Sequence, residues 1–324
     1  MKLISLLLIA ATYSFAFIIG VGGFSACNSK YGASFEKNCP YIQRKPIFQF
    51  LKREVPNVNA VSMWITKGWK QDWYPAITIN KAIQRGYIPI FIFYWFGDDI
   101  SPKYVKKHKK EYLKDLKRFS DFLTKIKGPK IVILNPEYNE NKMNASRLFD
   151  ILQAHSILII KEKNPKAKIG ICLGDFGDYN LIWDTLNWDL NLPSLNYSVK
   201  LSDFIAFQEM RALTRNTKEQ ILNTPLRALA FATYLHKKFK KPTFLAYLAI
   251  SSYKNEELQK EVIKDFVKLL PLFKNSADLL GINLFHYIDV PNHVGYFNEA
   301  EKYFGIKRKS GEKKPSFEEF KKLK

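Results

Sequence analysis

Lys130-Ile131-Val132-Ile133-Leu134-Asn135-Pro136-Glu137-Tyr138-Asn139-Glu140-Asn141 joins a short apolar run to a group of amides and carboxylates. The apolar half predicts a buried strand, and Pro136 ends its ladder because proline has no N–H to donate. Side chains two residues apart on a strand share a face, so we expect Asn135 and Glu137 to point the same way. The stretch therefore predicts a strand that ends in reactive groups, and the alternative is an ordinary polar loop.

Short apolar runs alternate with amphipathic stretches along the whole chain, which is typical of β-α units around a parallel sheet. Eight strands are predicted, over 17–24, 60–66, 88–95, 130–134, 168–173, 204–207, 243–250 and 280–287. Helices are predicted over 48–53, 73–85, 102–126, 145–163, 218–239 and 256–273, with a last helix from Ser316. No Gly-x-Gly-x-x-Gly motif opens these units, so the predicted α/β fold is a single-domain (β/α)8 TIM barrel over residues 17–324, not a doubly wound sheet.

The N-terminal segment 1–16 has the pattern of a secretory signal peptide. Lys2 precedes a short apolar core, and Ser14-Phe15-Ala16 provides small residues for cleavage near Ala16. The sequence thus predicts a secreted or periplasmic protein, with an uncleaved anchor or lipid modification of Cys27 as alternatives. In an oxidising compartment Cys27 and Cys39, which lie in one loop rich in small residues, are expected to form a disulfide.

The net charge of +21 would attract phosphates, anionic lipid or acidic polysaccharide. Much of this charge lies in 103–118 and 235–241, on predicted outer helices whose charged faces are expected to be solvated. No nucleic-acid motif accompanies it, and export argues against a nucleic-acid partner, whereas association with an envelope surface stays open. The cysteines and histidines lack zinc-ligand spacing, so no metal and no cofactor are predicted.

Polar and aromatic side chains follow several predicted strands, and in a (β/α)8 barrel these positions converge at the C-terminal face. Sugar rings stack their C–H faces on aromatic rings and hydrogen-bond through their hydroxyls to amides and carboxylates, so this mixture predicts a carbohydrate site. The expected substrate-binding residues are Trp95, Asn135, Asn139, Gln208, His286 and Tyr287.

Cleavage of a glycosidic bond needs one carboxylic acid that protonates the leaving oxygen and a second carboxylate that acts as nucleophile or base. Glu137 is the expected acid, because partial burial and a neighbouring carboxylate would raise its pKa. Glu209, at the end of the sixth strand, is the preferred second carboxylate, and Asp175 is the closest rival. The structural alternative for Glu209 is an ion pair with Arg211 or Arg215.

Pro136-Glu137-Tyr138-Asn139 and the closing segment Gly311-Glu312-Lys313-Lys314-Pro315-Ser316-Phe317-Glu318-Glu319-Phe320 resemble motifs of the retaining (β/α)8 glycoside hydrolase clan that includes β-mannanases and cellulases. The resemblance implies that Glu137 is the acid/base group at the end of strand four. Two features depart from the clan's pattern. Residues 247–252, where the clan has its nucleophile, contain no carboxylate, and Asn135 lies two residues before Glu137 instead of next to it.

The sequence therefore predicts an exported glycoside hydrolase that acts on a polysaccharide or oligosaccharide. Acidic and N-acetylated glycans are both among the substrates that this prediction allows. One alternative is a barrel of the cell envelope that binds glycan without cleaving it. Another is a substrate-assisted enzyme, because Asn-x-Glu on strand four is similar to barrel enzymes that act on N-acetylglucosamine, in which the substrate acetamide is the nucleophile.

Overall fold

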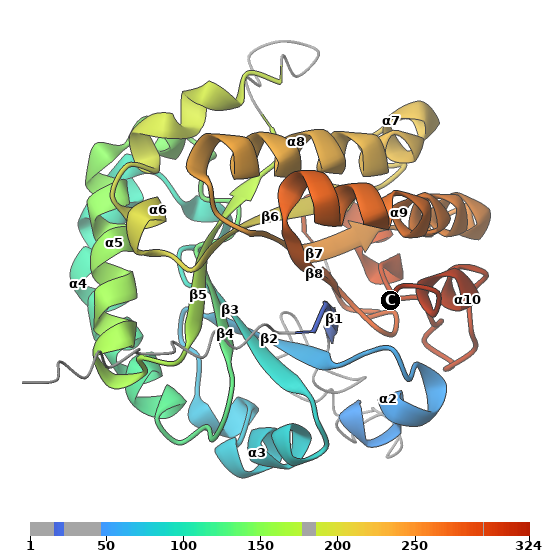
Figure 1. Ribbon diagram of the computed structural model, residues 1–324, viewed down its shortest axis with the longest axis horizontal. Helices are drawn as coiled ribbons and strands as arrows, with labels where there is room; N and C mark the ends of the chain where they lie inside the picture. The colour runs from blue at the N-terminus through green and yellow to red at the C-terminus, as the bar shows by residue number, and fades with distance from the viewer. Residues whose placement is uncertain (1–15, 23–46, 177–185, 294) are drawn as a thin grey trace, which may run out of the picture.

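Eight parallel strands form a closed barrel in which each strand pairs with the next and β8 pairs with β1 (Figure 1). The computed structural model describes residues 16–22, 47–176, 186–293 and 295–324. The strands are β1 (Ile18–Gly22), β2 (Ala60–Thr66), β3 (Ile88–Tyr94), β4 (Ile131–Leu134), β5 (Lys168–Gly174), β6 (Phe204–Arg211), β7 (Thr243–Ile250) and β8 (Leu279–Leu284). The predicted single-domain (β/α)8 barrel is thus confirmed.

Helices cover the outside of the barrel, as Figure 1 shows. They are α2 (Phe48–Glu54), α3 (Ala76–Gln84), α4 (Pro102–Leu123), α5 (Arg147–Lys163), α6 (Ser198–Leu201), α7 (Lys218–Leu222), α8 (Thr224–Phe239), α9 (Glu256–Ala277) and α10 (Ser316–Phe320). Short 3-10 turns stand in the loops: η2 (Gln71–Trp73), η3 (Gly97–Asp99), η4 (Met143–Ala145), η5 (Trp188–Ser194) and η6 (Asn298–Tyr303). Among the described helices, none combines the length and the hydropathy needed to cross a membrane.

Several predicted bounds differ from the structure by a few residues, and two of these differences concern the sixth strand and the helices that follow it. The sixth strand continues to Arg211, four residues beyond its predicted end. The single helix predicted over 218–239 is two helices, because α7 ends at Leu222 and α8 begins with Thr224 and Pro225. Proline is favoured in the first turn of a helix, where its missing N–H has no intrahelical partner to lose, so it starts a new helix here.

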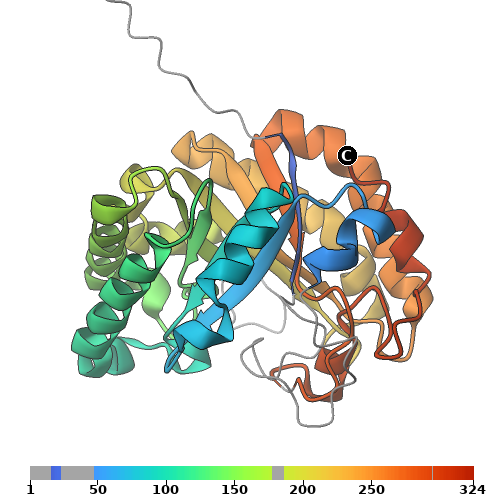
Figure 2. The ribbon, with the colours of Figure 1, turned by 90° about the horizontal axis from the view of Figure 1, so that it is seen from below.

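The strands are buried on both faces, and two apolar clusters result (Figure 2 shows the strands from the side). Ile92, Cys172, Ala206 and Tyr247 belong to the cluster that fills the barrel, whereas alternate residues such as Phe207 pack against the helices. Strand β7 breaks this alternation. Its register with β6 and with β8 shifts in the middle of the strand, and both Ala246 and Tyr247 belong to the inner cluster.

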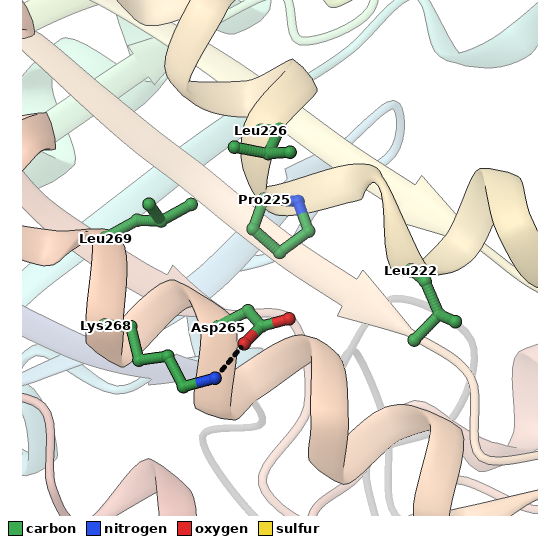
Figure 3. Close-up of a pocket in the computed structure, with 6 residues that line it drawn as sticks. All are labelled: Leu222, Pro225, Leu226, Asp265, Lys268 and Leu269. Carbon is green, nitrogen blue, oxygen red and sulfur yellow. Dashed lines mark hydrogen bonds and ion pairs between the residues drawn. The ribbon is translucent and has the colours of Figure 1, made fainter.

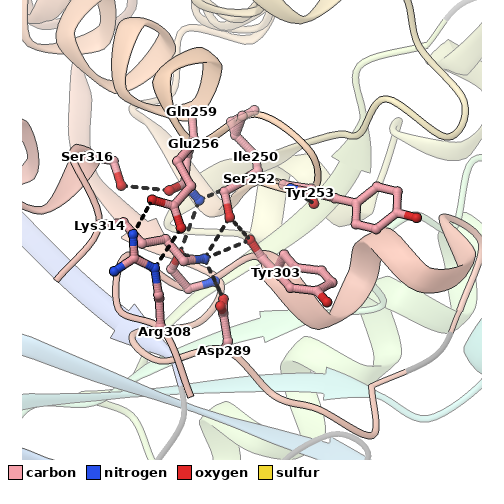
Figure 4. A network of polar contacts seen from close by, with 12 residues as sticks. Ile250, Ser252, Tyr253, Glu256, Gln259, Asp289, Tyr303, Arg308, Lys314 and Ser316 are labelled. Atoms are coloured by element: carbon pink, nitrogen blue, oxygen red, sulfur yellow. Dashed lines mark hydrogen bonds and ion pairs between the residues drawn. The ribbon is translucent and has the colours of Figure 1, made fainter. Parts of the chain in front are cut away.

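A buried lysine locks the loops after β7 and β8 to the C-terminal segment (Figure 4). Lys314 Nζ donates to Asp289 Oδ1 at 2.6 Å, to Ser252 Oγ at 2.7 Å and to the Gly305 carbonyl at 2.8 Å. Burial raises the pKa of Asp289 to about 6 although Lys314 opposes the shift. The closing segment of the sequence therefore has a structural role, and Ser252 and Asp289 are committed to this lock.

Candidate active site at the mouth of the barrel

Glu137 lies directly after β4, at the C-terminal end of the barrel, which we call the mouth. Its backbone is in the left-handed region, with φ of 58°, and Asn135 has φ of 47°. Asparagine tolerates this conformation, but a glutamate held there costs about 1–3 kcal/mol. Such strain persists only where the surrounding structure imposes it, and it is concentrated at functional sites. The strand end predicted to carry chemistry is therefore strained, as is the later part of the same loop at Asn141 and Lys142.

The Glu137 carboxyl meets Tyr247, which reaches it from the inner face of β7. The Tyr247 hydroxyl donates to Glu137 Oε1 at 2.5 Å. Burial raises the pKa of Glu137 to about 8, and the hydrogen bond from Tyr247 opposes part of that rise. At neutral pH the carboxyl therefore keeps its proton, as a general acid must.

Three further carboxyl groups lie close enough to act on Glu137 through their charge, and with it they form what we call the acidic cluster: Asp98, Glu137, Glu140 and Glu301. The negative charges of Glu140, Asp98 and Glu301 all raise the pKa of Glu137. Burial, together with the charge of Asp98, raises the pKa of Glu140 to about 7. Among the described residues, no lysine or arginine forms an ion pair with Asp98, Glu137 or Glu140.

Each of the three neighbours is held differently. Asp98, in η3 just after β3, is exposed and accepts a hydrogen bond from the Tyr94 hydroxyl. Glu140 is half-buried in the loop after β4. Glu301 is buried and accepts from the Phe297 N–H at 3.0 Å, with His293 Nε2 at 3.3 Å. Asp98 is therefore the carboxylate of this group that solvent water reaches most easily.

Aromatic rings line the barrel beneath the acidic cluster. Trp64 lies 5.4 Å from Tyr94, 5.2 Å from Tyr247 and 5.4 Å from Phe285, measured between ring centroids. These rings come from β2, β3, β7 and the end of β8, so four parts of the barrel converge there. An apolar wall of this kind excludes water and contributes to the high pKa of Glu137.

Gln208 and His286, two of the predicted substrate-binding residues, belong to this end of the barrel. Gln208 pairs with Tyr247 in the β6–β7 register and follows Ala206 on the inner face. Its Oε1 is buried and has no hydrogen-bond partner among the described residues. The His286 ring lies 4.2 Å from the Phe285 ring, measured between centroids and at a tilted angle, and burial lowers the pKa of His286 well below the usual value.

Glu209 and Asp175 belong to a different environment, and this corrects their predicted role opposite Glu137. Glu209 follows the outward-facing Phe207 by two residues and is fully buried, with Oε2 3.1 Å from Arg211. Asp175 Oδ2 is 2.5 Å from Arg211 and also contacts Arg227 of α8. Burial and the charge of Asp175 hold the pKa of Glu209 well above its usual range. Arg211 is thus the neighbour of Glu209 that the structural alternative named, although the raised pKa favours a protonated Glu209 carboxyl in this contact.

Three other predicted substrate-binding residues point toward the helices, which is a second correction. Trp95 Nε1 donates to Asp115 of α4 at 2.8 Å. The Tyr287 hydroxyl donates to Glu54 of α2 at 2.5 Å. The side chain of Asn135 turns to Tyr112 of α4, at 3.5 Å. The expectation that Asn135 and Glu137 share a face fails because both residues leave extended geometry.

Asn139 has a structural role at the strand ends. Its amide donates to the Gly174 carbonyl at 3.1 Å and accepts from the Gly174 N–H at 2.7 Å, which ties the loop after β4 to the end of β5. It therefore supports the loop of Glu137 and does not face the mouth as a free amide. Cys27 and Cys39, with their predicted disulfide, lie outside the described residues.

Sequence reasoning did not select Tyr247, Tyr94, Trp64 or Asp98. The pair Tyr94-Trp95 carried a usable signal, because adjacent strand residues face opposite sides and only one of them can face the barrel interior. Tyr247 carried none, since its inward position depends on the register shift in β7.

A small pocket of about 180 Å³ lies elsewhere, in the helical layer between α7, α8 and α9 (Figure 3). It is lined by Leu222, Pro225, Leu226, Asp265, Lys268 and Leu269. Asp265 and Lys268 form an ion pair at 2.8 Å on the surface of α9. Among the described residues of this lining, the only charged ones, Asp265 and Lys268, are paired with each other, and the others are apolar. The mouth is therefore the better candidate for chemistry.

The fold is shared with solved (β/α)8 glycoside hydrolases. GH5_18 from Bifidobacterium longum matches with 14% identity and a TM-score of 0.64, over 95% of this chain and 79% of that one. A GH26 β-mannanase from Bacteroides ovatus matches with 12% identity and a TM-score of 0.64, over 95% and 88%. A β-D-glucuronidase from Dictyoglomus thermophilum matches with 13% identity and a TM-score of 0.62, over 95% of this chain but 50% of that one.

At these identities the similarity shows the fold, and the chain spans about half the length of the glucuronidase. No protein-family model matches the sequence, and no curated protein matches it significantly. The fold thus places this chain beside glycosidases, while its chemistry has to be argued from the mouth itself.

Proposed function

We propose that this protein hydrolyses a glycosidic bond, with Glu137 as the proton donor. The observation that carries the proposal is the protonated carboxyl at the end of β4: burial raises the pKa of Glu137 to about 8, and Tyr247 fixes one of its oxygens. Cleavage of the bond requires a group that still holds a proton near neutral pH and can transfer it to the leaving sugar oxygen. The similarity in fold to glycosidases supports the same conclusion.

Asp98 is the second carboxylate in this proposal. It is exposed to water and is oriented by the Tyr94 hydroxyl, whereas Glu140, with its pKa raised to about 7, is only partly ionised at neutral pH. Asp98 would take a proton from the attacking water as the water oxygen bonds to the anomeric carbon. Glu137 would give its proton to the leaving oxygen as that bond breaks. This sequence inverts the anomeric configuration.

The deciding experiment measures turnover of a glycan panel by the wild type and by Glu137→Gln. The panel holds a β-mannan, the disaccharide Manβ1-4GlcNAc seen bound to the Bifidobacterium longum protein, and a β-glucuronide. Removal of a general acid lowers the rate by about 10²–10⁴-fold. Glu257→Gln, on the exposed surface of α9, is the matched control and should leave the rate unchanged. Full activity of Glu137→Gln would overturn the proposal.

A glycan-binding barrel without hydrolysis is the second candidate. The observation that favours it is β7, whose end, Ser251 and Ser252, carries no carboxylate. Binding of a panel member without any product from the wild type would support this candidate.

The role of Asp98 is tested by nuclear magnetic resonance of the first product formed. Retention of the anomeric configuration would contradict the step in which Asp98 activates water.

A further inference from the structure

Three members of the acidic cluster differ from several other carboxylates of the molecule in having no lysine or arginine partner among the described residues. The chain carries 51 lysines and arginines against 30 acidic residues. Even so, among the described residues no basic side chain pairs with Asp98, Glu137 or Glu140. Carboxylates elsewhere, such as Asp175 and Glu54, do have basic partners at ion-pair distance. The negative charge of Asp98 and of ionised Glu140 is therefore not compensated by a lysine or arginine of the described residues.

Gln208, near the mouth, provides a second and independent observation, a buried hydrogen-bond acceptor without a donor among the described residues. It is 5% exposed, and its Oε1 has no partner among the described residues. It lies on the inner face of β6, beside Tyr247, whose hydroxyl reaches Glu137. A buried acceptor oxygen without a donor costs free energy, which a bound group carrying N–H or O–H donors would recover.

We propose that the mouth prefers a sugar that carries a protonated amine, a hexosamine with a free ammonium group, over a neutral sugar and over a uronic acid. This proposal rests on the proposed function for its site. The ammonium would bind Glu140 and offer its remaining hydrogens to neighbouring acceptors such as Gln208 Oε1. A sugar carboxylate would instead meet the carboxyls of Asp98 and Glu140 without a basic partner among the described residues.

The experiment is calorimetric binding of three monosaccharides, glucosamine, glucose and glucuronate, to the full chain at pH 7.5. The expected order is glucosamine tightest and glucuronate weakest, with glucosamine about tenfold tighter than glucose, because a close charge pair is worth at least that much. Glu140→Gln should bring glucosamine to within about twofold of glucose, since removal of one charge removes the coupling. The exposed control Glu257→Gln should keep the tenfold difference.

Equal or tighter binding of glucuronate would overturn the preference, and so would a glucosamine advantage that survives Glu140→Gln. The two proposals fail separately. Preferential binding of the amine without hydrolysis of any glycan would contradict the proposed hydrolase activity and support the ammonium site. Hydrolysis of a uronide in preference to an amino sugar would contradict the ammonium site and support the hydrolase activity.

Discussion

Two groups of buried carboxyls flank the strand ends, and they differ in their partners. On the outer side, Asp175 and Glu209 lie with Arg211, and Arg227 of α8 completes the group. At the mouth, Glu137 has a tyrosine hydroxyl and other carboxyls around it, and no basic partner among the described residues. The outer group is a structural ion-pair network, whereas the mouth keeps a proton available for transfer. Burial raises the pKa of both Glu137 and Glu209, but in the outer group Arg211 and Arg227 pair with Asp175 and, against the effect of its burial, hold its pKa below the usual range.

The largest effect expected from this comparison is on stability. Arg227→Met removes one of the two guanidinium groups that hold Asp175, and breaking a buried pair costs about 3 kcal/mol because it leaves charge uncompensated. Urea unfolding measures this loss. Below the unfolding transition kcat/KM should stay within about threefold of wild type, because the network faces the helices. A loss of activity at unchanged stability would mean that the outer group serves the site.

Lys238→Met is the matched control for this variant. Lys238 lies on the same helix, α8, and forms an exposed pair with Asp189 at 3.1 Å. Exposed pairs contribute about 0–1 kcal/mol, so this variant should unfold close to the wild type. A similar loss in both variants would show that the burial of the Arg227 pair has no special value.

The same comparison explains which features of the fold and of the site could be predicted from the sequence. The order of elements and the position of Glu137 at the end of β4 followed from apolar runs, turn residues and a proline. The face of each side chain did not, because parallel strands are apolar on both faces and show no polar alternation. Trp95 and Glu209 were therefore assigned to the mouth, although their neighbours Tyr94 and Gln208 are the ones on the inner face.

Backbone irregularities account for the remaining differences. Asn135 was expected to share a face with Glu137, but both residues adopt positive φ and the side chains diverge. Tyr247 reaches the mouth because the register of β7 shifts within the strand. Neither feature has a local sequence signature as strong as a glycine, so the partner of Glu137 became visible only in three dimensions.

A smaller effect is expected from the pH dependence of stability. Glu137 has a folded pKa of about 8 against an ordinary value of 4.5 for the unperturbed side chain. Folding therefore takes up a proton between these two values, so this group favours the folded state on the acid side and the advantage is lost as pH rises through 8. Glu137→Gln lacks the group, so from pH 5 to pH 9 the wild type should lose about 1–2 kcal/mol relative to the variant, discounted for partial exposure. Parallel urea curves at the two pH values measure this, and a constant difference would contradict the raised pKa.

The smallest predicted effect tests the contact between Tyr247 and Glu137. The hydroxyl stabilises the charged carboxylate and so opposes the rise in the pKa of Glu137. Tyr247→Phe removes it, and the pKa of Glu137 should rise further. The alkaline limb of kcat/KM, which reports the loss of the acid's proton, should then move up by roughly half a pH unit, about 0.7 kcal/mol.

Tyr138→Phe is the control for the phenol. Tyr138 is equally buried, but its hydroxyl contacts Ser194 Oγ at 3.0 Å, on the side of the helices. Its removal should leave the alkaline limb in place even where it lowers stability. If both variants moved the limb equally, the shift would reflect loosened packing instead of the hydrogen bond. A limb that moves to lower pH in Tyr247→Phe would mean that the phenol favours the protonated acid, because only then would its loss make the proton easier to remove.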